Sequence, residues 1–382
     1  MNFLDFNNPV LTLTILFFNI ALCEYLVRKT FLKHAGTALL VILVTAIEAN
    51  LFLIPSASDP SVVYDIVFTY VAPISIFYLL LECNFASIRK AGFPILIMFL
   101  IGSLGTVLGV FIAGYVVNGV ENIGEKFPMI AGMFTGTYTG GSINFNAVAL
   151  HYEMNEEANL YTGAVAIDNI ITAIWMVATI ALPKFLQSWL PRAKQAEGKQ
   201  EVLTEKDLND TESLNPMNSS ILIVLGLAAL LVSDWLAVMS SIPSILILTT
   251  ISLILAQLKL IQELDGSRVL GIIGIYLFLA VIGAYCELAA LPKIGSIATY
   301  LLLFAFILVV IHGLVTFGLG YLLKIDWDIV SIASQANVGG SGSAIALARS
   351  LDRNDLLLPS ILIGTVGNAI GTYLGFMMVN FF

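Results

Sequence analysis

Apolar runs long enough to cross a membrane recur along the whole of this chain, and they constrain its fold more than any other feature. A helix of about 20 residues spans a hydrocarbon core of about 30 Å. Helices are the expected spanning elements, because lipid cannot hydrogen-bond to an exposed backbone. The composition agrees, since 58% of the 382 residues are apolar and only 11% are charged. We therefore predict an all-α membrane protein that crosses the bilayer many times.

The apolar segments form two sets of six with a polar stretch between them. The first set covers about 8–27, 36–54, 62–82, 92–119, 128–152 and 159–183. The second set covers about 218–239, 242–258, 269–287, 294–323, 328–348 and 357–380. The chain is therefore divided into a first repeat (1–183), a cytoplasmic linker (184–217) and a second repeat (218–382).

The two halves are related in sequence. At an offset of 199 residues, Gly140-Gly141-Ser142 aligns with Gly339-Gly340-Ser341, and eight of the 34 positions from 140 to 173 are identical. Apolar composition inflates chance matches, but internal repeats of this kind are typical of secondary transporters.

The distribution of Lys and Arg predicts how the segments cross the membrane, because these residues concentrate in cytoplasmic loops. If all twelve segments span, eight of the 17 basic residues fall on one side and nine on the other. If the two Gly-Gly segments instead dip in and return, fifteen lie inside and only Lys126 and Lys293 lie outside. We therefore predict ten spans and two re-entrant hairpins.

Five spans and one hairpin in each half make the two repeats inverted. Both termini are then predicted to lie outside a bacterial inner (cytoplasmic) membrane. From Pro128 to Gly140 is about twelve residues, or roughly 18 Å of helix, which reaches the middle of the bilayer.

The two hairpin tips should meet near the bilayer centre and form a binding site. A helix that starts at a tip presents unpaired N–H groups to an anion, and a helix that ends there presents carbonyls to a cation. The predicted substrate-binding residues are Gly140, Gly141, Ser142, Asn144, Asn146, Gly339, Gly340, Ser341 and Ser343. The alternative is that small residues there only let membrane helices pack closely.

Asp168 is the strongest candidate for an ion ligand. It lies about ten residues into the sixth segment, or roughly 15 Å deep, and a carboxylate at that depth is a functional candidate. The alternative is a structural hydrogen bond between helices. The predicted ion-binding residues are Thr139, Asp168, Asn169, Asn337 and Asn368.

Other residues in the apolar segments rank lower as site candidates. Glycines 102, 105, 109 and 114 form a smooth face that favours helix packing over ligand binding. We expect most of a further set of polar residues to lie near helix ends or to pair with other side chains. They are Glu24, Glu48, Asp234, Glu287 and His312. The three cysteines and three histidines have no metal-site spacing, so neither a metal nor a cofactor is expected, sodium apart.

The segments 136–149 (GTYTGGSINFNAVA) and 333–344 (ASQANVGGSGSA) resemble the YjcL-like family of uncharacterised bacterial membrane proteins, over nearly the whole chain. More distantly, the paired Gly-Gly segments are similar to the hairpins of sodium–glutamate symporters and sodium-dependent hydroxycarboxylate transporters. That resemblance implies a cation–proton antiporter-like architecture, elevator-type dimers, and hairpin tips at glycines 140, 141, 339 and 340. Ile143 departs from the motif, since Gly342 occupies the matching position, and no basic residue lies near either tip in the sequence.

These features predict a sodium-coupled symporter of a small polar or anionic solute, working as an elevator-type homodimer in the lipid bilayer. The hairpins would move with the sixth and twelfth segments against a scaffold of the other helices. A cation–proton antiporter centred on Asp168 is the first alternative. An integral membrane enzyme is less favoured, because neither His-Glu-x-x-His nor Gly-x-Ser-x-Gly occurs, and a passive channel would need a ring of subunits. We expect no enzyme activity and no nucleic-acid partner.

Overall fold

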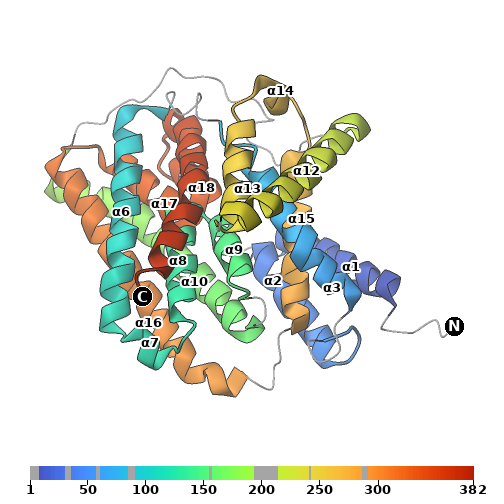
Figure 1. The fold of residues 1–382 in the computed structure, drawn as a ribbon. Coiled ribbons are helices and arrows are strands. Elements are labelled where there is room, and N and C mark those ends of the chain that lie inside the picture. The colour runs from blue at the N-terminus through green and yellow to red at the C-terminus, as the bar shows by residue number, and fades with distance from the viewer. Residues whose placement is uncertain are drawn as a thin grey trace.

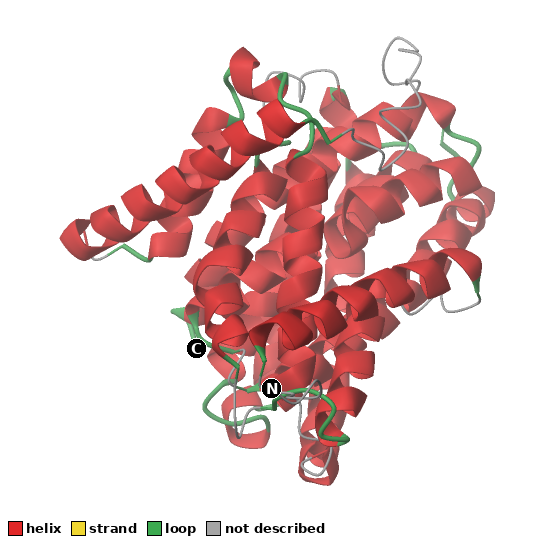
Figure 2. Ribbon diagram, turned by 90° about the vertical axis from the view of Figure 1, so that its right-hand side faces the viewer, coloured by secondary structure: helices red, strands yellow, loops and turns green. Residues whose placement is uncertain are grey.

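The computed structural model describes residues 8–30, 36–56, 61–84, 91–154, 157–192, 214–240, 242–285 and 291–382. The secondary structure of these residues is entirely helical, as Figure 2 shows. Most of the predicted linker, together with Cys286 and Glu287, lies outside the described residues.

The helices follow the order that the apolar segments predict. The first half contains α1 (Pro9–Lys29), α2 (Gly36–Asn50), α3 (Val62–Ile66), η2 (Val67–Val71), α4 (Ala72–Leu80), α6 (Phe93–Val116), α7 (Gly119–Asn122), α8 (Phe127–Gly140), α9 (Ser142–His151) and α10 (Ala158–Trp189). The second half contains α12 (Pro216–Ser240), α13 (Ser244–Leu255), α14 (Lys259–Gln262), α15 (Ser267–Tyr285), α16 (Leu291–Leu322), α17 (Trp327–Ser350), η5 (Asn354–Leu356) and α18 (Leu357–Val379). One boundary differs, since α10 continues through Pro183 into the predicted linker.

Proline sets the start of several of these helices. α1, α6 and α8 each carry a proline in their first two positions, where the missing N–H would have had no partner. The third segment has a wider π-helical turn, Val67–Val71, just before Pro73. Pro73 cannot donate to the carbonyl one turn earlier, and the wider turn accommodates that lost hydrogen bond.

Eight helices in the described part of the chain are long and apolar enough to cross a membrane. They are Pro9–Lys29, Val62–Leu80, Phe93–Val116, Ala158–Trp189, Pro216–Ser240, Ser267–Tyr285, Ile297–Leu322 and Leu357–Val379. Two shorter apolar helices, Thr37–Asn50 and Ser244–Leu255, occupy the second position in each half. The chain is therefore an all-α membrane protein.

Two segments are interrupted by a glycine at equivalent positions of the two halves. The backbone at Gly141 has φ 107° and ψ 178°, and at Gly340 it has φ 71° and ψ −175°. This region of backbone space is open essentially to glycine alone. The two breaks are 199 residues apart, which is the offset of the sequence repeat.

At each break the chain turns back on itself. A Cβ built on Gly136 would lie 3.1 Å from the Asn144 carbonyl carbon, and the Ser343 hydroxyl lies 3.3 Å from the Gln335 carbonyl oxygen. Residues eight apart in a continuous helix are separated by about 12 Å along the axis. We therefore call α8–α9 (127–151) hairpin one and α17 (327–350) hairpin two.

The helices form two bundles, which lie side by side in Figure 1. The hairpin bundle contains α6, α8, α9, α10, α16, α17 and α18, and the outer bundle contains α1, α2, α3, α4, α12, α13 and α15. The sixth and twelfth segments, which are α10 and α18, pack against the hairpins as predicted, and α6 and α16 pack against them as well.

The glycine face of α6 explains this close packing. Cβ atoms built at Gly105 and Gly109 would lie 3.2 Å from the His312 carbonyl oxygen and 2.6 Å from the Leu308 carbonyl oxygen. Both carbonyls belong to α16, so the glycines allow the two backbones to approach directly. The predicted packing role of this face is confirmed at these positions.

Candidate functional site

The tips of the two hairpins meet. A Cβ built at Gly340 would lie 3.7 Å from the Gly140 carbonyl oxygen and 3.8 Å from the Gly141 Cα atom. The carboxyl end of α8, the amino end of α9 and the break in α17 therefore converge on one small region. The predicted meeting of the four tip glycines is confirmed for Gly140, Gly141 and Gly340.

The contacts of the two hairpins with their neighbouring helices differ at one equivalent position. Gly140 packs on Gly367 of α18 so closely that a Cβ there would lie 2.0 Å from the Gly367 carbonyl carbon. The residue equivalent to Gly367 in the first half is Asp168 of α10. In the first half, the Asp168 carboxylate therefore occupies the position of the packing glycine, and this carboxylate borders a cavity.

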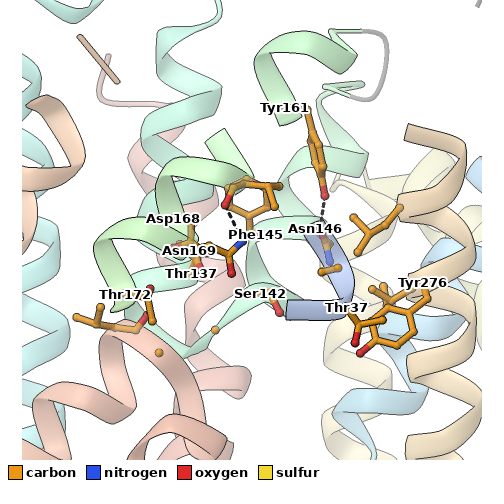
Figure 3. A pocket seen from close by; sticks show the side chains of 17 residues that line it. Thr37, Thr137, Ser142, Phe145, Asn146, Tyr161, Asp168, Asn169, Thr172 and Tyr276 are labelled. Atoms are coloured by element: carbon orange, nitrogen blue, oxygen red, sulfur yellow. Dashed lines mark hydrogen bonds between the residues drawn. The ribbon is translucent and has the colours of Figure 1, made fainter. Parts of the chain in front are cut away.

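This cavity, which we call the Asp168 cavity, has a volume of about 310 Å³ and lies between the two bundles. The outer bundle contributes Thr37 and Ala38 from α2 and Ile275, Tyr276 and Leu279 from α15. The hairpin bundle contributes Thr137, Gly141, Ser142, Phe145, Asn146, Tyr161, Val165, Asp168, Asn169, Thr172, Val338 and Gly339. Figure 3 shows Asp168, Asn169 and Thr137 grouped together, with Thr37 and Tyr276 across from them and Ser142 between.

The protein provides only some of the hydrogen-bond partners that the Asp168 carboxylate could accept. Its Oδ1 atom has no hydrogen-bond partner in the described part of the chain, although the hydroxyls of Thr137 and Tyr138 lie beside the carboxyl group. No Lys or Arg is among the described residues that line this cavity. A carboxylate in such a place must bind a cation, take up a proton or keep water to remain stable.

Two asparagines hold their side chains at the cavity wall. The Tyr161 hydroxyl donates to Asn146 Oδ1 at 2.5 Å, the bond drawn in Figure 3. The Asn169 amide donates to the Val165 carbonyl one turn earlier at 2.8 Å. Each side chain therefore has a fixed orientation and still borders the cavity.

Four other predicted site residues lie outside the lining of this cavity and make contacts within the protein. Asn144 donates to the Gly367 carbonyl at 3.2 Å and accepts from the Thr372 hydroxyl at 2.8 Å, so it joins hairpin one to α18. Ser343 donates to the Gly340 carbonyl within hairpin two. These contacts favour a structural role for both side chains.

Asn337 and Thr139 connect the two hairpins. The Asn337 amide donates to the Ser103 hydroxyl at 3.0 Å and to the Thr139 carbonyl at 3.3 Å. The Thr139 hydroxyl donates to the Thr135 carbonyl one turn earlier. Asn337 Oδ1 is unpaired within the described chain but packs against Gly102, since a Cβ built there would lie 2.0 Å from it.

A second cavity, which we call the Arg268 cavity, adjoins the first and has a volume of about 230 Å³. It contains the remaining predicted residues Ser341 and Asn368, together with Ser142 and Asn146. Sequence reasoning missed its two charged residues, Glu82 and Arg268, and found no basic residue near the tips. The sequence contains one signal for Arg268. A cation in the first turn of a helix is unfavourable beside the positive end of the helix dipole, so its presence there suggests a function.

His312 takes part in a buried polar network rather than in either cavity. Its Nδ1 atom lies 2.9 Å from the Gly102 carbonyl and its Nε2 atom lies 2.8 Å from the Ser334 hydroxyl. The Trp175 indole donates to the same hydroxyl at 3.1 Å. This histidine therefore joins α6, α16 and hairpin two.

Comparisons with known proteins agree with this description of a membrane protein. The chain is 30% identical over 343 residues to the uncharacterized membrane protein YjcL of Bacillus subtilis (strain 168), and the match covers 84% of each chain. The predicted YjcL-like resemblance is thereby confirmed. Residues 12–382 match the sequence model of a family described as a protein of unknown function, DUF819. The chain belongs to the DUF819 family.

Proposed function

We propose that this protein is a secondary transporter, and that it carries a small polar or anionic solute together with sodium. The main support is the arrangement of the two hairpins. Two helical hairpins, broken at equivalent glycines, meet tip to tip beside a cavity that contains a carboxylate with an unpaired oxygen. Irregular backbone at membrane depth is tolerated where protein buries it or where it lines a water-filled path.

The number and order of apolar helices support inverted repeats. The eight long helices and the two short ones make ten, five in each half, and neither hairpin is among them. Ten spans with one re-entrant hairpin per half would give the two halves opposite orientations. We propose that both termini lie outside a bacterial inner membrane, with the linker in the cytoplasm.

Asp168 is the proposed coupling residue. Sodium takes oxygen ligands, and the carboxylate lies beside the Thr137 hydroxyl and the end of α8, whose last carbonyls point toward the tip. A discontinuous helix offers its carboxyl end to a cation in this way in transporters. Bound sodium would neutralise the charge that the cavity leaves unpaired.

Alternating access would follow from the position of the cavity between the bundles. Thr37, Ala38 and the α15 residues belong to the outer bundle, whereas Asp168 and the hairpin tips belong to the hairpin bundle. We propose that the hairpin bundle moves as a unit against the outer bundle, which forms the scaffold of a homodimer. Such a movement would carry the solute and the ion together.

A cation–proton antiporter centred on Asp168 is the second candidate. It is favoured by the presence of one carboxylate and the absence of a lining Lys or Arg among the described residues of that cavity. The antiporter would move sodium against protons without any solute, whereas the symporter requires the solute. Both candidates are transporters, and neither needs an enzymatic step or a cofactor.

The proposal is tested by the thermal stability of purified protein in sodium and in potassium at equal ionic strength. A ligand that binds only the folded state raises its stability by mass action. We expect sodium to raise the unfolding midpoint of the wild type and to have no such effect on Asp168→Asn. Asp234→Asn is the matched control, since Asp234 is exposed on α12 of the outer bundle. Equal midpoints in the two cations at every pH would exclude sodium coupling.

A further inference from the structure

The two cavities lie in series along α15. Arg268 and Ile272 border only the Arg268 cavity, Leu279 borders only the Asp168 cavity, and Ile275 and Tyr276 border both. Ser142 and Asn146 of hairpin one also border both cavities. From Arg268 to Leu279 the helix rises by about 16 Å. The cavities therefore form two adjoining compartments with a shared wall at the tip of hairpin one.

The two compartments differ in charge. The described lining of the Asp168 cavity contains one carboxylate and no basic side chain. The lining of the Arg268 cavity contains one guanidinium, from Arg268, and one carboxylate, from Glu82. The remaining polar groups of the Arg268 cavity are neutral, and they are the side chains of Ser142, Asn146, Tyr276, Ser341 and Asn368.

We propose that the Arg268 cavity binds a small zwitterionic solute of the amino-acid class. The solute's carboxylate would pair with Arg268 and its ammonium group with Glu82. This inference rests on the proposed transport function and names the class of solute. The volume of about 230 Å³ is below the roughly 300–1,000 Å³ of drug-sized sites, which limits the solute to a small molecule.

The chemistry of the two groups requires opposite charges on the solute. A guanidinium forms paired hydrogen bonds with a carboxylate, and it keeps its charge at every physiological pH. Both charged residues have interaction partners in this structure, so the solute's two ends would replace contacts within the protein. A solute with only a carboxylate would satisfy Arg268 but leave the Glu82 carboxylate facing a second negative charge, which is unfavourable.

The hydroxyl and amide groups complete a polar compartment without further charge. Ser341 and Asn368 come from hairpin two and α18, whereas Arg268 and Glu82 come from the outer bundle. The solute would thus contact both bundles in this conformation, and its pairs with Arg268 and Glu82 would break when the hairpin bundle moves. The Asp168 cavity, next to it along α15, would hold the coupling cation.

The test is the thermal stability of purified wild-type protein in sodium buffer with three matched mixtures. These are the neutral L-amino acids, their N-acetyl derivatives, which keep only the carboxylate charge, and their amides, which keep only the ammonium charge. We expect the free amino acids to raise the unfolding midpoint by on the order of a few °C, and each derivative mixture to give a much smaller rise.

Variants that remove one charge then test which residue pairs with each end of the solute. Arg268→Gln and Glu82→Gln should each lose the response to amino acids. Lys259→Gln and Glu263→Gln, which remove exposed charges between α13 and α15, should keep it. The mixture comparison uses only the wild type, so it is informative even if a variant does not fold.

The proposal is overturned if free amino acids give no rise, if either derivative mixture gives an equal rise, or if Arg268→Gln responds as the wild type does. Its failure is distinguishable from failure of the proposed function. A sodium-specific midpoint shift that depends on Asp168, without any amino-acid response, would retain a sodium-coupled transporter of another solute class. Loss of both responses would reject the two together.

Discussion

The backbone break at Gly340 gives a prediction whose magnitude follows directly from the structure. Gly340 has φ 71° and ψ −175°, and a Cβ built there meets no atom closer than 3.7 Å. Gly340→Ala therefore adds no steric clash and tests only the backbone conformation. A non-glycine residue in this region costs about 1–3 kcal/mol. We expect Gly340→Ala to lower the free energy of unfolding by that amount.

Gly342 provides the matched control two residues along the same hairpin. It lies in the helical second arm, and a Cβ built there meets no atom within 4 Å. Alanine is more favourable than glycine inside a helix by about 0.5–1 kcal/mol, so Gly342→Ala should leave stability unchanged or raise it.

Reversible unfolding of the purified protein in mixed detergent micelles, followed by tryptophan fluorescence, measures both free energies. Equal stability of Gly340→Ala and the wild type would refute the assigned break. An equal loss in both variants would show that the hairpin tolerates no methyl group at all, and the conformational reasoning would again be wrong.

Two further predictions use the same unfolding assay. Arg353 is buried and forms ion pairs with Asp326, Asp328 and Asp355 at the base of hairpin two. Arg353→Met should therefore lower the free energy of unfolding by about 3–5 kcal/mol. Arg349 is exposed, so Arg349→Met should stay within about 0.5 kcal/mol of the wild type. Asn144→Ala leaves buried groups of α18 unpaired, and Asn146→Ala leaves the buried Tyr161 hydroxyl unpaired, so each should cost about 1–3 kcal/mol, but only Asn146→Ala should remove the response to sodium or solute. Equal stability of the Arg353 and Arg349 variants, or an equal response of the two asparagine variants to sodium and solute, would contradict these assignments.

Much of the fold could be predicted because it depends on local properties of the sequence. The sequence predicts an apolar segment over 357–380, and α18 covers Leu357–Val379, because the length of an apolar run limits the length of a membrane helix. The breaks at Gly141 and Gly340 could be located because glycine is the residue that such a backbone conformation requires.

The grouping of helices into bundles could not be predicted in the same way. Whether α6 belongs with the hairpins depends on which helix meets its glycine face, and that helix is α16, some 200 residues later in the chain. A smooth helix face predicts close packing but does not identify its partner.

Sequence identifies Asp168 as a candidate site residue more readily than it separates Asn144 from Asn146 or finds Arg268. Asp168 was identified because a carboxylate is rare at membrane depth, and it does border the cavity. Asn144 and Asn146 have the same chemistry two residues apart, yet one bonds to α18 and the other faces both cavities. Arg268 was missed because its place at a helix end favours an interpretation as a loop charge that sets orientation.

The proposed alternating access requires the tip of hairpin one to be exposed in turn to the two sides of the membrane. It is tested by Ser142→Cys in a background with the native cysteines replaced by alanine, since Ser142 is exposed and borders both cavities. A membrane-impermeant thiol reagent is applied to right-side-out and to inside-out vesicles, with Lys259→Cys as the control, because the proposed topology places Lys259 on the cytoplasmic side alone. We expect Ser142→Cys to react from both sides and sodium to change the ratio of the two rates. Reaction from one side only, under every ionic condition, would contradict it.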